Sequence, residues 1–176
     1  RRLAPIPCMI VAEIGINHNG NMDIAFRSVL AAKEAGADAV KFQNYKTEDF
    51  LSGHELRYTY QSQGRKVTES QFSMFKRCEL DDAQIWRLAA FCRTHDSLVL
   101  STPTNEAGIA VLREAGTAYL KTGSDYLPPL PLIRAMAHSG IPTILSTGMA
   151  TLAEIDDAVR AFRDAGGRDL ALLHCT

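Results

Sequence analysis

The fold of this chain is decided by stretches such as Ala39-Val40-Lys41-Phe42-Gln43, a short apolar run that ends on polar side chains. Five more runs of this kind occur, and the six occupy residues 8–13, 39–43, 98–102, 118–122, 143–147 and 171–176. Parallel strands whose two faces are both covered have this nearly continuous apolar character. We therefore predict six buried parallel strands.

Helix signals separate the six runs. Five helices are expected, over residues 24–35, 81–92, 105–115, 130–138 and 152–165. Asn21 or Asp23 can cap the first of them, and Gly36 follows its end, where a left-handed residue is favoured. Strand and helix alternate along the chain, and right-handed crossovers between such units give a parallel sheet.

One connection is much longer than the others. Residues 44–79 lack a clear core periodicity and are rich in Tyr, Gln, Ser, Lys and Arg. Loops of this length in compact domains are usually functional or disordered. Aromatic residues such as Tyr45 and Phe75 argue against plain disorder, so we predict a partly helical lid over the end of the second strand. This segment is called the lid below.

A strand–helix pattern fits either an open doubly wound sheet or a barrel. The first strand is followed by no GxGxxG motif and no P-loop, and polar residues follow every strand rather than one switch point. Both features favour a (β/α)8-type barrel. Such a barrel needs eight strands and about 250 residues. We therefore expect residues 1–176 to be an incomplete barrel of six strands and five helices.

Polar side chains gather where the predicted strands end, although burial of polar groups costs free energy and packing does not require it. In a parallel α/β protein this rim is where ligands bind. The candidate set is Glu13, Lys41, Gln43, Ser101, Thr102, Lys121, Ser124, Ser146 and His174. Glu13 follows four apolar residues, which predicts a poorly solvated carboxylate. Two lysines with hydroxyls at neighbouring strand ends suit a ligand that carries a phosphate and a carboxylate.

Composition excludes several classes of function. The 176 residues carry a net charge of −1, which gives no electrostatic basis for binding nucleic acid or a membrane surface. No apolar stretch approaches the roughly 18 residues that span a bilayer. The four cysteines have no CxxC spacing, so we expect buried thiols in a reducing cytoplasm and no zinc site.

The motifs resemble those of the sialic acid synthase family, the phosphoenolpyruvate-dependent synthases of nonulosonic acids. The similarity runs in order from Pro7 to Thr176, through AEIGINHNG, AVKFQ, STP, LKTGS, LSTGM and LLHCT. Members of that family are TIM barrels followed by a small antifreeze-protein-like domain. The resemblance implies that the last two barrel strands and the C-terminal domain lie outside this chain.

The resemblance also implies roles for individual residues. The phosphoenolpyruvate pocket would comprise Lys41, Thr102, Lys121, Ser124 and Ser146. Glu13 would lie near the reacting carbons, and Glu13, Lys41 and Lys121 would be catalytic. A divalent cation, manganese or magnesium, would be held by two histidines beyond residue 176, which leaves no metal ligand in this chain. The implied partners are phosphoenolpyruvate and an amino sugar, in a homodimer at full length.

The expected acceptor-sugar contacts are Asn17, Gln43 and Tyr126. Here the chain departs from the family pattern, which continues KIGSGE and places a glutamate against the sugar. Tyr126 stands in place of that glutamate, and Pro128-Pro129 replace a polar pair. An aromatic ring offers apolar surface, so the departure favours a less hydroxylated or more acylated acceptor, such as a 2,4-diacylamino-6-deoxyhexose, over N-acetylmannosamine.

Two other functions remain open at this point. A Schiff-base aldolase or lyase acting on a keto acid would use Lys41 or Lys121 as a neutral nucleophile. A truncated barrel without activity could instead serve as a binding module.

Overall fold

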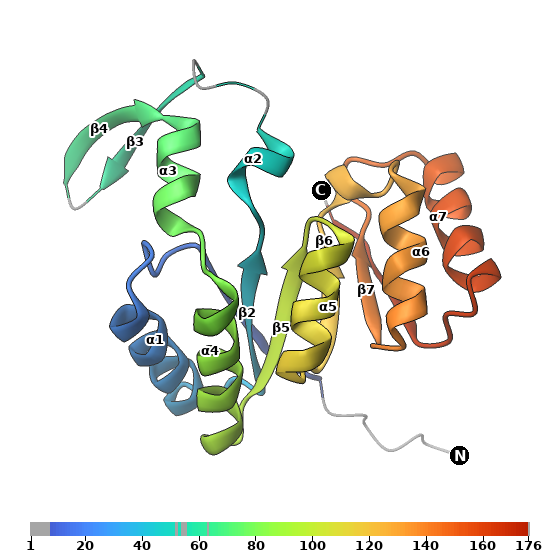
Figure 1. Ribbon diagram of the computed structural model, residues 1–176, viewed down its shortest axis with the longest axis horizontal. Coiled ribbons are helices and arrows are strands. Elements are labelled where there is room, and N and C mark those ends of the chain that lie inside the picture. Colours follow the sequence, from blue (N-terminus) through green and yellow to red (C-terminus); the bar gives the residue numbers. More distant parts are fainter. Residues whose placement is uncertain (1–7, 52, 54–55, 63, 176) are drawn as a thin grey trace.

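A computed structural model describes residues 8–175 except 52, 54, 55 and 63 (Figure 1). Its main sheet has six parallel strands, as predicted: β1 (Val11–Gly15), β2 (Ala39–Asn44), β5 (Leu98–Pro103), β6 (Tyr119–Thr122), β7 (Thr143–Ser146) and β8 (Leu170–Leu173). Their order in the sheet, β1-β2-β5-β6-β7-β8, is also their order along the chain. A sheet without a switch point is typical of a barrel, so the fold is that of an incomplete (β/α)8-type barrel.

The five expected helices are present and lie side by side in chain order on one face of the sheet (Figure 1). They are α1 (Met22–Glu34), α4 (Asp82–Thr94), α5 (Glu106–Ala115), α6 (Leu130–Ser139) and α7 (Leu152–Asp164). Each starts or stops at a residue suited to it. Asn21 accepts two backbone N–H bonds at the start of α1, and Gly116, at φ 74°, ends α5 in the left-handed region.

Buried apolar residues pack on both faces of the sheet, because strand residues alternate between the two faces. Val40, Phe42 and Leu120 face the helices and pack in the main cluster with residues such as Val29 and Leu88. Ala39, Leu100 and Ile144 form a smaller cluster with Val11 and Tyr119, to which no helix contributes. The second cluster marks the inner face, which is the barrel interior.

The lid is more structured than predicted. It contains α2 (Thr47–Phe50), the antiparallel pair β3 (Arg57–Ser62) and β4 (Arg65–Ser70), and α3 (Gln71–Cys78). The prediction of a partly helical segment was correct, but the hairpin was not foreseen. With α2 and α3, the described residues form seven α-helices. Figure 1 shows the lid beyond the carboxyl end of β2. A short 3-10 helix, η1 (Ser124–Tyr126), follows β6.

Two expectations about the ends of the sheet were wrong. The first strand begins at Val11 rather than Cys8, because Asp38 draws the Ile10 N–H into a hydrogen bond of 2.7 Å before the ladder starts. Consequently Met9 and Ile10 are exposed. The cysteines also differ: two are buried as expected, but Cys8 is exposed and Cys175 is half-buried.

No helix in the described part of the chain combines the length and the apolar character needed to cross a membrane.

Candidate active site

The strand register places most of the predicted site on the inner face. Glu13 pairs with Lys41, Gln43 pairs with Thr102, and Lys121 pairs with Ile144. The residues that share this face near the carboxyl ends of the strands are Glu13, Lys41, Gln43, Thr102, Lys121 and Ser146. Ser101 is an exception: it pairs with Phe42 and Leu120 on the helix-facing side, and its hydroxyl donates to the Phe42 carbonyl at 3.4 Å. His174 follows the last strand and is exposed.

Lys41 is a buried cation, only 4% exposed. Its Nζ lies 3.2 Å from Oε1 of Glu13, whose side chain is 56% exposed. In the described part of the barrel the Glu13 carboxylate is therefore open to water, contrary to expectation, because no described strand pairs with the free edge of β1. Burial lowers the pKa of Lys41; the Glu13 charge raises it, and the positive charge of Lys121 lowers it further.

Lys121 has a neutral partner instead. Its Nζ donates to Oγ of the buried Ser146 at 2.9 Å, and among the described residues it has no carboxylate partner. The two lysines are close enough for their charges to interact, and Glu13 offsets only one of them. The inner rim therefore carries an excess of positive charge, which favours an anionic ligand.

Thr102 contributes a buried hydroxyl that no described group satisfies. Such orphaned polar atoms are uncommon in folded proteins and call for an explanation, of which an absent ligand or water is one. Thr104, two positions further along, has the same property: its Oγ1 is buried without a hydrogen-bond partner among the described residues. Sequence reasoning proposed Thr102 for the site but missed Thr104, which stands one residue beyond the strand end.

The residues expected to contact an acceptor sugar fall into two groups. Gln43 and Tyr126 line one cavity of about 150 Å³, with Thr102 and Thr104. Burial raises the pKa of Tyr126, and the charges of Asp125 and Asp49 raise it further. Asn17, in contrast, is exposed in the turn after β1 and donates to the Ile14 carbonyl at 2.9 Å. Its role in sugar binding stays a prediction, as does that of Ser124 at the start of η1.

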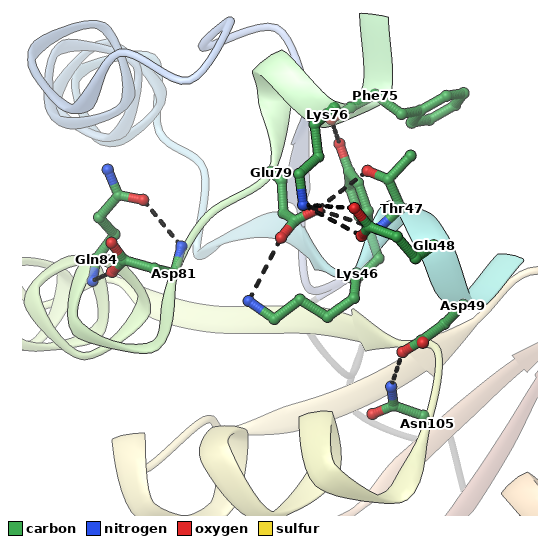
Figure 2. Close-up of polar contacts among 11 residues, drawn as sticks. Lys46, Thr47, Glu48, Asp49, Phe75, Lys76, Glu79, Asp81, Gln84 and Asn105 are labelled. Carbon is green, nitrogen blue, oxygen red and sulfur yellow. Dashed lines mark hydrogen bonds and ion pairs between the residues drawn. The ribbon is translucent and has the colours of Figure 1, made fainter. Parts of the chain in front are cut away.

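The two ends of the lid meet at Glu79 (Figure 2). The Glu79 carboxylate accepts hydrogen bonds from both N–H and Oγ1 of Thr47, each at 3.0 Å, and forms ion pairs with Lys46 and Lys76 at 3.5 and 3.1 Å. Lys76 also pairs with Glu48 at 3.0 Å. Burial opposes the Glu79 charge, but the bonds from Thr47 and Lys76 outweigh it and lower the pKa of Glu79. The two ends of the lid are thereby joined to each other.

Two further contacts fix the lid. Asn105 caps α5 by accepting from the Gly108 N–H, and its amide nitrogen donates to Asp49 of α2 (Figure 2). Gly20, at φ +74°, lies so close to α3 that a Cβ at this position would collide with the Arg77 carbonyl. No sequence pattern could reveal these contacts, because they join residues that are far apart in the chain.

A metal site is not built within the described part of the chain. No group of three or more His, Cys, Asp or Glu side chains there is placed to hold an ion. The divalent cation implied by the resemblance therefore lacks a donor set in these residues.

Comparison with known proteins identifies the family. Residues 28–176 match the model of the NeuB family. The chain is 37% identical to an uncharacterized protein of Methanocaldococcus jannaschii, over 96% of this chain and 46% of that protein. It is 34% identical to an N,N'-diacetyllegionaminic acid synthase of Legionella pneumophila, over 99% of this chain and 50% of that enzyme. Thus the chain spans about half the length of these curated relatives.

Among solved structures, an N-acetylneuraminic acid synthetase of Leptospira borgpetersenii in complex with citrate superimposes with a TM-score of 0.84 and 30% identity. The match covers 97% of this chain and 55% of that one.

Proposed function

The chain belongs to the NeuB family, and on this premise we propose that the protein condenses phosphoenolpyruvate with an N-acylamino sugar to form a nonulosonic acid. The observation that carries the proposal is the pair Lys41 and Lys121 on one face of the sheet, beside the hydroxyls of Thr102 and Ser146. The family relation supports it, because the synthases of legionaminic and N-acetylneuraminic acid are among the relatives.

In the proposed reaction, C3 of phosphoenolpyruvate attacks the aldehyde carbon of the open-chain sugar and forms the new carbon–carbon bond. Water then adds to the cationic C2, and phosphate leaves as the C–O bond breaks. Lys41 and Lys121 neutralise the phosphate and the carboxylate, a charge stabilisation worth several kcal/mol on the usual mutational scale. Thr102, Ser124 and Ser146 supply hydroxyl donors to the remaining anionic oxygens.

Glu13 is proposed to act near the reacting carbons. Its carboxylate lies against Lys41 and reaches solvent, so it can keep Lys41 protonated and exchange a proton with water. The described residues provide no donor set for a divalent cation, so the roles proposed for them are charge neutralisation, hydrogen bonding and proton exchange.

The test uses the full-length protein with phosphoenolpyruvate in water enriched in oxygen-18. Cleavage of the C–O bond places the heavy oxygen on C2 of the sugar acid and leaves phosphate unlabelled. Labelled phosphate, or no sugar acid from any N-acylamino sugar offered, would contradict the proposal.

For the acceptor, we propose a 2,4-diacylamino-6-deoxyhexose in preference to N-acetylmannosamine. Tyr126 presents apolar surface in the cavity, and a buried hydroxyl left unpaired costs about 1–3 kcal/mol. The Legionella relative, whose name specifies a diacetylated product, is in keeping with this choice. A higher kcat/KM for N-acetylmannosamine would rule it out.

A Schiff-base aldolase is the second candidate, because burial lowers the pKa of Lys41 and so favours the neutral amine that such chemistry needs. Borohydride reduction in the presence of a keto acid separates the two functions. An aldolase is trapped as a covalent adduct on lysine, whereas a synthase is not.

A further inference from the structure

The cavity beside the lysine pair has a wall that the proposed function leaves unexplained. Three aromatic rings from the lid, those of Tyr45, Phe50 and Phe75, line it together with Tyr126. The lining also includes Gln43, Asp125, Thr102 and Thr104. The hydroxyls of Thr102 and Thr104 are buried and have no hydrogen-bond partner among the described residues. One small space thus combines an apolar wall with hydroxyl groups that are free to bond.

The aromatic wall is held rigidly. The rings of Tyr45, Phe50 and Phe75 meet edge to face, with centroids 5.0–5.7 Å apart, a favoured geometry for aromatic pairs. The Tyr45 hydroxyl donates to the Phe75 carbonyl at 2.9 Å, and the Tyr45 side chain is buried. A wall already ordered before binding costs little conformational entropy when a ligand arrives.

The size of the cavity limits what it can hold. Its volume of about 150 Å³ is below the roughly 300–1,000 Å³ of a complete small-molecule site. It therefore suits one substituent of a ligand whose remainder lies over the inner rim. Gln43 and Thr102 connect the two places, since they line the cavity and share the inner face with Lys41.

We propose that this cavity is the subsite for an acylamino group of the acceptor sugar, with Phe50 and Phe75 limiting the length of the acyl chain and Thr104 bonding its amide. An acylamino group has an apolar methyl end for the aromatic wall and a carbonyl that can accept from a threonine hydroxyl. A free hydroxyl would leave the aromatic wall without an apolar partner. The proposal rests on the proposed function and assigns its specificity to residues of the lid.

Thr104→Val is the sharpest test, because valine has nearly the shape of threonine and lacks the hydroxyl. The Thr104 hydroxyl has no described partner, so the variant should unfold at the same temperature as the parent or slightly above it. In the full-length protein we expect the KM of an N-acetylated acceptor to rise about fivefold or more, as for loss of one hydrogen bond, while the KM of phosphoenolpyruvate stays within twofold.

Phe50→Ala and Phe50→Leu test the wall with a series of N-acetyl, N-propanoyl and N-butanoyl acceptors. The parent should prefer the acetyl compound, and shortening the side chain should move the preference toward longer acyl groups. Tyr58→Ala is the matched control, an aromatic residue of the same lid that is 53% exposed and does not line the cavity. Saturation-transfer NMR of the acceptor gives a binding readout for any variant with weakened turnover.

Two failures can be told apart. If the parent forms a sugar acid but its acyl preference and acceptor KM are the same in Thr104→Val and both Phe50 variants, the subsite assignment is wrong and the proposed function stands. If the parent forms no sugar acid with any acceptor, the proposed function fails and the assignment fails with it.

Discussion

The inner rim of the sheet and the lid differ in the side chains that they present and in how those side chains are positioned. On the rim, charged and hydroxyl groups are set by strand register: Lys41 is opposite Glu13, and Gln43 is opposite Thr102. In the lid, aromatic rings are set by a hairpin, two short helices and the carboxylate of Glu79. Rigid strands place the groups that meet an anion, and an added segment shapes the space beside them.

This division predicts that charge removal on the rim has the largest effect. Lys41→Ala or Lys121→Ala in the full-length protein should lower kcat/KM for phosphoenolpyruvate tens-fold or more, since a hydrogen bond to a charged group is worth about 1.5–3 kcal/mol. Lys66→Ala removes the same charge from an exposed position of the lid and should change little. Steady-state kinetics decide the matter, and unchanged constants in both rim variants would remove the basis of the anion site.

The second prediction concerns the lid, where a destabilising substitution should affect the acceptor sugar more than phosphoenolpyruvate. Glu79→Ala leaves both Thr47 donors and two lysines without their carboxylate, so amide hydrogen exchange should increase across the lid. The acceptor KM should rise roughly tenfold, which corresponds to a loss of about 1.4 kcal/mol in binding free energy. The phosphoenolpyruvate KM should change much less. Glu34→Ala, an exposed glutamate of α1, is the control. Equal effects on the two substrates would show that rim and lid do not act separately.

A pH dependence sharpens the description of the rim. Phosphoenolpyruvate affinity should fall as pH rises through the pKa of Lys41, because the cation is lost. Glu13 raises that pKa against the effect of burial, so Glu13→Gln should move the fall to lower pH. Binding measured by calorimetry from neutral to alkaline pH gives the midpoint for the parent and for the variant. A midpoint that stays in place would show that Glu13 does not support the Lys41 charge.

The smallest effect is expected from low pH, which should weaken the ion pairs and hydrogen bonds of the lid. Arg77 and then Tyr60 hydrogen-bond the Glu69 carboxylate and lower its pKa from 4.5 to about 2; the pKa of Glu79 is also lowered. Groups of this kind stabilise the fold above their unfolded pKa and lose that contribution as pH falls through the folded value. Hydrogen exchange in the lid should therefore increase between about pH 4.5 and 2, before exchange increases in the six-stranded sheet. An increase of hydrogen exchange in the lid and the sheet at the same pH would contradict this prediction.

The two regions also differ in how far sequence reasoning could reach. Strand ends such as Lys41 and Lys121 follow from apolar runs, because a buried parallel strand has a local signature and register then brings its end to a common rim. Ser101 was misplaced because one residue of offset turns a side chain to the opposite face. The exposure of Glu13 depends on which strand lies next to β1, and the apolar residues before Glu13 carry no information about that neighbour.

The contacts within the lid could not be predicted from local sequence patterns. The aromatic residues Tyr45 and Phe75 correctly predicted that the lid is ordered. The contact between their rings, however, depends on a reversal of the chain between residues 50 and 75, and no periodic pattern in the sequence indicates that reversal. Glu79 and Thr47 are bonded across 32 positions, and nothing near either residue marks it as a partner. Thr104 could have been suspected only as a polar residue soon after a strand, a signal that many loop residues share.

The pairing of β2 with β5 has a consequence for how the molecule folds and how it can change. The lid lies in the chain connection between these two neighbouring strands. Phe42 and Ser101, which are 59 positions apart in the sequence, are hydrogen-bonded there. Closing a chain loop costs only about 0.6 kcal/mol more for each doubling of its length, although long-range pairing slows folding. A lid of different length would therefore affect the rate of folding more than the stability of the fold. This connection is thus a place where the cavity that we propose for the acceptor sugar can change while the barrel strands stay the same.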